Sequence, residues 1–245
     1  MNKETIKINK LNTLMIAHRG ISALAKENSI EAFVLAGKST HYGIETDVHV
    51  TKDNKYIVHH DDNIKRCTGV DLIIEENNFD DIRKIPLLGM DNEETINKQY
   101  SPTLEEYLTI CKTYNKRPIL ELKAKMTEEN VLNIAKIVEQ FGLIDNITFI
   151  SFHPNNLIYL RNKYKDVDIQ FLVGEKPWYL RHVMFILLKK YRFGLDIDYH
   201  FVTERLIKKV HKCGLKINTW TVDDKLVAEQ FAKWGIDQIT SNGLE

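Results

Sequence analysis

The sequence predicts an α/β fold in which a parallel β-sheet is covered by α-helices. Short runs of β-type residues alternate with amphipathic helical stretches along almost the whole chain, a pattern typical of βαβ units. Glycine stands where three helical stretches end, at Gly142, Gly214 and Gly235, as expected of helix C-caps. A chain of 245 residues suits one α/β barrel, so we expect residues 1–245 to form a single domain.

Nine stretches are predicted to be strands, because each is short, mostly apolar and bounded by polar or turn-forming residues. The third of them is reached through a turn-forming segment at residues 52–55. In chain order the predicted strands are 14–17, 43–48, 56–59, 118–122, 147–151, 169–173, 193–197, 216–220 and 238–240.

The helices are predicted from apolar residues that recur on one face. In the first, Ile30, Phe33, Val34 and Gly37 keep one side apolar or small. The apolar stretch 178–188 is best explained as one of the amphipathic helices around the sheet. The first predicted helix is residues 29–38, and the others are 104–114, 128–141, 155–163, 204–213 and 224–234, with a weak one at 79–83.

We therefore expect a (β/α)8 TIM barrel. Because a closed barrel of this kind has eight strands, one of the nine candidates is extra, misread or outside the barrel. The connection between the second and third strands is too short for a crossover helix, so extended chain is expected there. Residues 62–101 are polar and irregular, and we interpret them as an insertion after the third strand, at the active-site end.

Composition excludes several classes of protein. Lys and Arg total 34, as do Asp and Glu, so the net charge is zero and nucleic acid is not an expected partner. No apolar run reaches the roughly 18 residues of a membrane helix, so stable membrane insertion is not expected. The polar N-terminus lacks a signal-peptide core, which favours a cytoplasmic protein. The three cysteines form no CxxC pair, which argues against disulfides or a zinc knuckle.

Three carboxylates are candidates for a metal site. Glu45 and Asp47 are two residues apart on one strand, so their side chains point to the same side. Glu121 ends the fourth strand, and the carboxyl ends of parallel barrel strands share one face. Converging carboxylates suit one hard divalent ion, Mg²⁺ or Ca²⁺. The alternative is that Glu45 and Asp47 are solvated or pair with Arg19 or Lys123.

Two histidines at the same face are candidates for proton transfer. His18 follows the first strand and His60 the third, and imidazole titrates near neutral pH. His59 points to the other side of its strand and is expected to be structural. Arg19 and Lys123 add positive charge beside the carboxylates, which together with a cation would make a phosphate site.

These residues occur in ordered motifs that resemble the glycerophosphodiester phosphodiesterase family. The match includes Ala17-His18-Arg19-Gly20, Glu27-Asn28-Ser29 and Glu45-Thr46-Asp47, followed by His59-His60-Asp61 and Leu120-Glu121-Leu122-Lys123. It continues through Ser151-Phe152 and Trp220-Thr221-Val222 to Gly235-Ile236-Asp237 and Ile239-Thr240, so it covers nearly the whole chain.

The resemblance implies a barrel enzyme that hydrolyses small glycerophosphodiesters to glycerol 3-phosphate and an alcohol with a divalent metal. Matched position by position, it implies Glu45, Asp47 and Glu121 as metal ligands and His18 and His60 as general acid and base. Arg19 and Lys123 would hold the phosphate, and Glu27 would support the metal or the glycerol. Phe152 and Trp220 would line the pocket or belong to the barrel core.

The sequence departs from the family pattern at three places. Lys26 stands where the family usually has Pro, and Asp223 where it usually has Asn. The final motif reads Thr240-Ser241-Asn242-Gly243, where Thr-Asp-x-Pro is common. None of the departures removes a proposed metal ligand or catalytic histidine, but they affect the substrate rim and the last loop.

Two other functions are compatible with the pattern. One is hydrolysis of a lipid phosphodiester, as by a lysophospholipase D, with the apolar stretch 178–188 at a lipid-facing rim beside Lys189 and Lys190. The other is a catalytically silent barrel that binds phosphorylated ligands. The sequence also leaves open which histidine is the acid, and whether water or the glycerol hydroxyl attacks.

Overall fold

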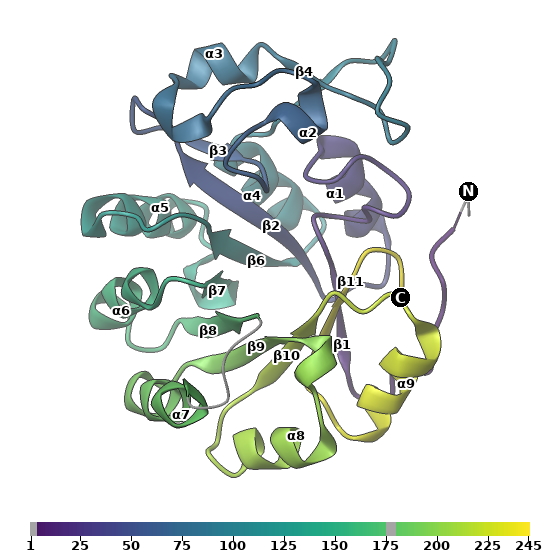
Figure 1. Cartoon of the computed structure of the whole chain (residues 1–245), viewed down its shortest axis with the longest axis vertical. Coiled ribbons are helices and arrows are strands. Elements are labelled where there is room, and N and C mark those ends of the chain that lie inside the picture. Colours follow the sequence, from purple (N-terminus) through teal and green to yellow (C-terminus); the bar gives the residue numbers. More distant parts are fainter. Residues whose placement is uncertain (1–3, 175–179) are drawn as a thin grey trace.

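The computed structural model, which describes residues 4–174 and 180–245, is a closed barrel surrounded by helices (Figure 1). Each barrel strand pairs in parallel with its neighbours, and β1 pairs with both β2 and β11, which closes the ring. The predicted TIM barrel is therefore confirmed. Its strands are β1 (Leu14–Ala17), β2 (Gly43–Val50), β6 (Arg117–Leu122), β7 (Thr148–Ser151), β8 (Asp168–Val173), β9 (Gly194–Asp198), β10 (Ile217–Trp220) and β11 (Gln238–Ser241).

The third of the nine predicted strands lies outside the barrel. It is β3 (Tyr56–Val58), which pairs antiparallel with the end of β2. The expectation that it runs in the same direction as the other strands was wrong, because the short connection from β2 permits only a hairpin. β2 extends to Val50, and β3 returns along it until the His59 N–H donates to the Asp47 carbonyl at 3.1 Å. The returning strand therefore brings His60 to the barrel end.

The helices form an outer layer around the barrel (Figure 1). Side chains of Ser29, Thr103, Thr127, Thr203 and Asp224 cap five of them by accepting backbone N–H groups of the first turn. The helices are α1 (Ile30–Lys38), α4 (Leu104–Thr113), α5 (Glu128–Gln140), α6 (Pro154–Lys163), α7 (Leu180–Tyr191), α8 (Glu204–His211) and α9 (Lys225–Lys233).

The apolar stretch 178–188 falls partly outside the described residues, which exclude Trp178. Its remainder belongs to α7, where Phe185 and Leu188 are buried and Ile186 is exposed. This is the pattern expected of an amphipathic barrel helix. Within the described ranges, no helix is long and apolar enough to span a membrane.

The predicted insertion forms a small layer over β2 and β3, drawn at the top of Figure 1. Its core is Ile64, Ile74 and Ile82, which pack with Ile57 of β3. Because it packs on the hairpin that carries His60, the insertion is placed to influence that residue. Its elements are α2 (Lys65–Thr68), a 3-10 turn (Ile74–Glu76), α3 (Phe79–Arg83), β4 (Pro86–Leu87) and β5 (Gln99–Tyr100), of which the last two pair antiparallel.

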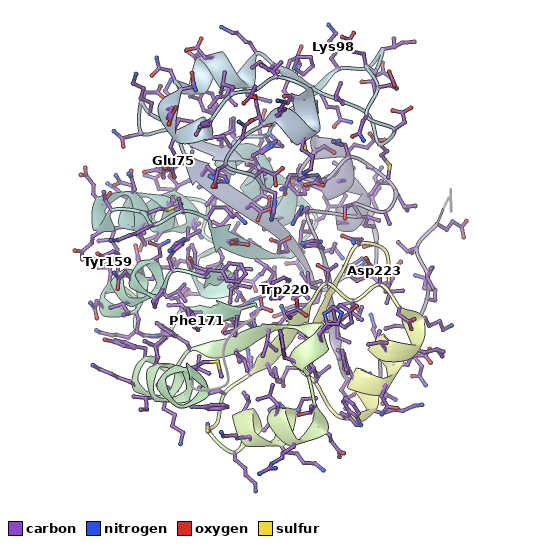
Figure 2. The ribbon with its side chains drawn as sticks, viewed as in Figure 1. Glu75, Lys98, Tyr159, Phe171, Trp220 and Asp223 are labelled. Carbon is purple, nitrogen blue, oxygen red and sulfur yellow. The ribbon has the colours of Figure 1, made fainter. Side chains whose placement is uncertain are left out.

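The barrel interior below the site is filled by packed apolar side chains. Ile16, Ile119, Ile150 and Leu172 form an apolar layer, against which Trp220 packs. Polar side chains also lie inside the barrel, where the Gln170 amide donates to Gln238 Oε1 at 2.7 Å. In Figure 2 Trp220 lies near the centre of the barrel.

Candidate active site

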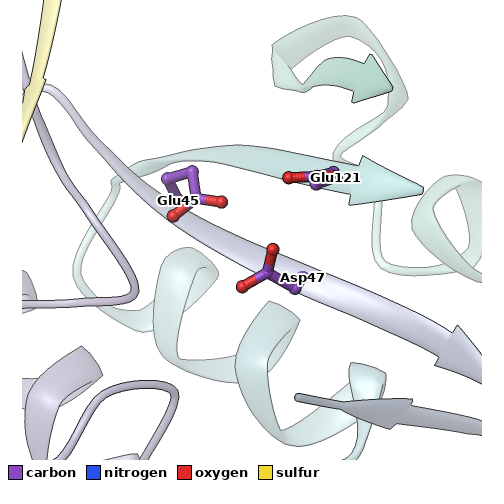
Figure 3. A group of neighbouring side chains, drawn as sticks. All are labelled: Glu45, Asp47 and Glu121. Carbon is purple, nitrogen blue, oxygen red and sulfur yellow. The ribbon is translucent and has the colours of Figure 1, made fainter. Parts of the chain in front are cut away.

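Three acidic side chains meet inside the barrel on two adjacent strands. Glu45 and Asp47 come from β2 and Glu121 from β6, and the register places Asp47 beside Glu121. Ligand oxygens of all three lie within 4.8 Å of one another, and Figure 3 shows the carboxylates gathered between the two strands. The side chains are almost fully buried. The predicted convergence of the three carboxylates is confirmed.

Burial makes this arrangement of negative charge costly. Burial, and secondly Asp47, raise the pKa of Glu45, while burial raises the pKa of Glu121 to about 8. Burial also acts to raise the pKa of Asp47, but Lys123 and Arg19 hold it well below its ordinary value. Bound protons or a cation would offset the repulsion among the three groups.

The donor set fits a hard divalent cation. Carboxylate oxygens are ligands that Mg²⁺ and Ca²⁺ prefer, and here three carboxylates converge on one point. Asp47 Oδ1 is buried and has no hydrogen-bond partner among the described residues, so one oxygen in the cluster is available as a ligand. The triad is a possible metal site.

Two cationic side chains border the triad. Lys123 Nζ lies 3.1 Å from Glu121 Oε1 and 3.4 Å from Asp47 Oδ1. The Arg19 backbone N–H donates to Glu45 at 2.8 Å, and its Nε lies 3.6 Å from Asp47 Oδ2. The ion pairs that the sequence offered as an alternative are thus present. Arg19 Nε is buried without a hydrogen-bond partner in the part of the chain that is described, so this donor can receive an anion.

The two predicted histidines line the same small pocket as Glu45, Glu121 and Arg19, with a volume of about 50 Å³. His18 Nδ1 lies 2.7 Å from Asn242 Oδ1, and His60 Nδ1 lies 2.6 Å from Asp61 Oδ1. Burial, then Arg19, lower the pKa of His18 to about 4. Burial also lowers the pKa of His60, although Asp47 acts to raise it.

Two aromatic rings complete the pocket wall. Phe152 and Trp220 meet edge to face with their centroids 5.6 Å apart. Phe152 is partly exposed at the rim, whereas Trp220 also packs on the apolar layer below. The structure therefore places Trp220 both in the pocket wall and against the barrel core.

Comparison with known proteins decides the family. Residues 18–245 match the model of the glycerophosphoryl diester phosphodiesterase family. The chain belongs to this family. The resemblance seen in the sequence motifs is confirmed, and the protein is an enzyme of the family.

Relatives of the family cover almost the whole chain. A glycerophosphodiester phosphodiesterase from Caldanaerobacter subterraneus subsp. tengcongensis is 27% identical over 243 residues, 96% of each protein. The crystal structure of one from Parabacteroides distasonis is 30% identical, with a TM-score of 0.74 over 94% of this chain and 93% of that one. An Oleispira antarctica phosphodiesterase, solved with the product sn-glycerol-3-phosphate, shares the fold at 23% identity. Its TM-score is 0.83, over 96% of this chain and 95% of that one.

In this member of the glycerophosphoryl diester phosphodiesterase family, the insertion adds a residue that sequence reasoning missed. Arg66 of α2 donates to both oxygens of Glu27, at 2.7 and 2.8 Å, and to Asp61 Oδ2 at 2.6 Å. Glu27 also accepts from Arg19 at 2.8 Å. Arg66 thus links Asp61, which contacts His60, to Glu27, which pairs with Arg19. A single arginine in an irregular polar segment carries no local signal of this role.

Glu27 lies between the two arginines, which occupy both of its oxygens. Burial acts to raise its pKa, but Arg66 and Arg19 hold the pKa at about 2. The sequence motif predicted that Glu27 sits beside the site, and the structure places it where it orients the Arg19 guanidinium.

A second missed residue is Asp196 on β9. It lines the pocket with His18 and Trp220, is 1% exposed, and its Oδ1 has no hydrogen-bond partner within the described residues. Burial raises its pKa to about 7. One acid within the apolar run of β9 was the only signal of this position in the sequence.

The raised pKa of Asp196 predicts a pH-dependent loss of stability. Ionisation opposes folding, so the cost is absent near pH 4 and grows until the pH passes the folded-state pKa of about 7. The Asp196→Asn side chain cannot ionise, so at pH 8 this variant should have a Tm several degrees above that of the wild type. The corresponding gain in the free energy of unfolding is at most about 4 kcal/mol. Thermal unfolding at pH 5 and pH 8 checks this. A difference that does not change with pH would contradict it.

Proposed function

We propose that this enzyme hydrolyses glycerophosphodiesters to sn-glycerol 3-phosphate and an alcohol. The observation that carries the proposal is the meeting of the Glu45, Asp47 and Glu121 carboxylates with two histidines at one site. The names of the relatives and the sn-glycerol-3-phosphate complex of the Oleispira antarctica enzyme support the same reaction class.

One divalent ion, Mg²⁺ or Ca²⁺, would be held by Glu45, Asp47 and Glu121. When bound, it supplies positive charge that offsets the negative charge of the phosphodiester. The fit rests on the three buried carboxylates, whose ligand oxygens lie within 4.8 Å of one another.

Arg19 and Lys123 would bind the non-bridging oxygens of the phosphate. A phosphodiester resists nucleophilic attack because it is already an anion, and charge builds on these oxygens in the transition state. Arg19 offers a planar fork for two oxygens, and its unpartnered Nε lies near Asp47. Lys123, between Asp47 and Glu121, is placed to span the metal site and the phosphate.

The two histidines would move the protons. In each ring Nδ1 is engaged by a neighbour, Asn242 for His18 and Asp61 for His60, so Nε2 is the nitrogen that exchanges protons with substrate. One ring, with a lone pair on Nε2, accepts the proton of the attacking hydroxyl. The other, protonated on both nitrogens, donates its Nε2 proton to the leaving alkoxide. The attacking hydroxyl is either water or the neighbouring glycerol hydroxyl. Only the second gives a cyclic phosphate, which ³¹P NMR would detect.

The proposal is tested by incubation with glycerophosphocholine, with sn-glycerol 3-phosphate and choline measured as products. Release of both supports it. Cleavage of lysophosphatidylcholine alone would favour the lipid phosphodiesterase, for which the described part of α7 gives no specific support. A rise in Tm with glycerophosphocholine but no product would indicate the silent barrel.

Arg66→Ala should lower kcat about 10- to 100-fold, the usual cost of removing a residue that orients a site residue. The substitution removes the anchor of Asp61 and one partner of Glu27. Steady-state kinetics and Tm should be compared with Lys65→Ala, a neighbour paired with Asp71 away from the pocket. Equal kcat values for the two variants would show that Arg66 does not support the site.

A further inference from the structure

The loop after β11 holds the ring of His18. Asn242 Oδ1 lies 2.7 Å from His18 Nδ1. The His18 backbone N–H donates to the carbonyl of Ser241, the last residue of β11, at 2.9 Å. Two consecutive residues therefore hold the backbone and the ring of His18. An amide oxygen only accepts hydrogen bonds, so in this orientation His18 carries its proton on Nδ1 and its lone pair on Nε2.

Asp223 determines which way the Asn242 amide faces. Its Oδ1 accepts the Ser241 hydroxyl and the Asn242 backbone N–H, each at 2.8 Å. Its Oδ2 accepts the Asn242 side-chain NH₂. A carboxylate has no proton to donate, so only the nitrogen of the Asn242 amide can face it. The amide oxygen is left to accept from His18 and from the Ser22 hydroxyl, each at 2.7 Å.

We propose that Asp223 and Asn242 are a positioning pair that holds His18 in the tautomer with its lone pair on Nε2. The pair lies in two of the three places where the sequence departs from the usual pattern of the family. Its catalytic consequence rests on the proposed function, because the Nε2 lone pair is what lets His18 accept a proton from the attacking hydroxyl.

Asp223→Asn should reverse the tautomer. The new amide oxygen would still accept the Ser241 hydroxyl and the Asn242 N–H, so its NH₂ group would face Asn242. Two NH₂ groups cannot pair, so the Asn242 amide would turn and present its own NH₂ to His18. The His18 proton would then move to Nε2. We expect kcat to fall about 100-fold or more, since loss of the correct histidine tautomer costs up to about 10⁴-fold in a catalytic triad.

The reciprocal exchange Asp223→Asn with Asn242→Asp should restore the tautomer. The carboxylate at position 242 would accept both the His18 Nδ1–H and the amide at position 223, and every other hydrogen bond of the pair would be kept. We expect at least a tenfold recovery of kcat over Asp223→Asn. Asn242→Asp alone places two carboxylates side by side and should not recover. Equal losses in the single and double variants would overturn the proposal.

The exchange also predicts a pH effect. A carboxylate beside His18 favours the protonated ring, so the acid limb of kcat/KM should move to higher pH in the double variant. The other charged or titratable groups that line this pocket or act on His18 are the same in both proteins: Arg19, Glu45, Asp47, His60, Glu121 and Asp196. A purely structural role of the pair would not move this limb.

A measurement that needs no activity separates this proposal from the proposed function. Nitrogen-15 NMR of labelled histidine rings at neutral pH reports the tautomer, with the His18 signal assigned by its loss in His18→Gln. We expect Nδ1–H in the wild type, Nε2–H in Asp223→Asn and Nδ1–H in the double variant. Nε2–H in the wild type would overturn the proposal, whatever the substrate.

Asp224→Asn is the matched control. It removes one negative charge from the adjacent residue, whose side chain caps α9 and does not contact Asn242 in the described hydrogen bonds. Asn serves as well as Asp at an N-cap, so the helix should be kept. Wild-type kcat and tautomer are expected. Loss of either would show that the effect of Asp223→Asn is one of net charge.

Discussion

Replacing His60 by alanine is expected to lower kcat by about 10²- to 10⁴-fold, the usual contribution of a general acid or base. KM should change far less, because Arg19 and Lys123 still bind the phosphate. Steady-state kinetics at saturating metal measures both. His18→Ala should behave in the same way, since both rings line the same pocket.

The control for this experiment is His200→Ala. His200 is an exposed histidine outside the pocket, paired with Asp198. Its loss should leave kcat unchanged. If His60→Ala retained near wild-type turnover with an unchanged Tm, the assignment of His60 to proton transfer would be wrong.

Removing one carboxylate of the triad should act on the metal instead of on proton transfer. Glu121→Gln deletes a charge at the centre of the site, so metal affinity should fall by more than the 10- to 100-fold typical of changing an outer partner of a ligand. Calorimetric titration of Mg²⁺ and Ca²⁺ measures the affinity directly. Activity should be lost at low metal and partly regained with excess metal.

Glu105→Gln on the exposed side of α4 is the matched control, since it makes the same chemical change away from the pocket. Its metal affinity should equal that of the wild type. If Glu121→Gln bound Mg²⁺ and Ca²⁺ as tightly as the wild type, Glu121 would not be a ligand. If excess metal restored His60→Ala as well, the division of roles between triad and histidines would fail.

The barrel and the acidic triad could be predicted because both depend on regular geometry. Alternation of strands and helices requires parallel pairing, and a spacing of two residues on a strand fixes that Glu45 and Asp47 point the same way. The direction of β3 could not be predicted from its own three residues. It follows from the length of the connection to β2, which was recognised as too short for a helix but not as a hairpin.

The partners of the candidate site residues could not be predicted from the sequence, for a different reason. Arg66 and Asn242 lie 39 and 224 positions along the chain from the residues they contact, Glu27 and His18. Nothing in a local pattern records such a contact. The departures at Asp223 and in the motif that contains Asn242 were visible as changes, but only the structure shows that the two side chains face each other.

The metal dependence of the reaction is tested by ³¹P NMR of EDTA-treated protein with glycerophosphocholine, followed by addition of Mg²⁺ or Ca²⁺. If the triad makes this barrel a metal-dependent phosphodiesterase, the diester signal should not change in EDTA. The signal of sn-glycerol 3-phosphate should appear after metal is added. Equal hydrolysis with and without metal would contradict the role of the triad, and no hydrolysis with either metal would contradict the proposed substrate.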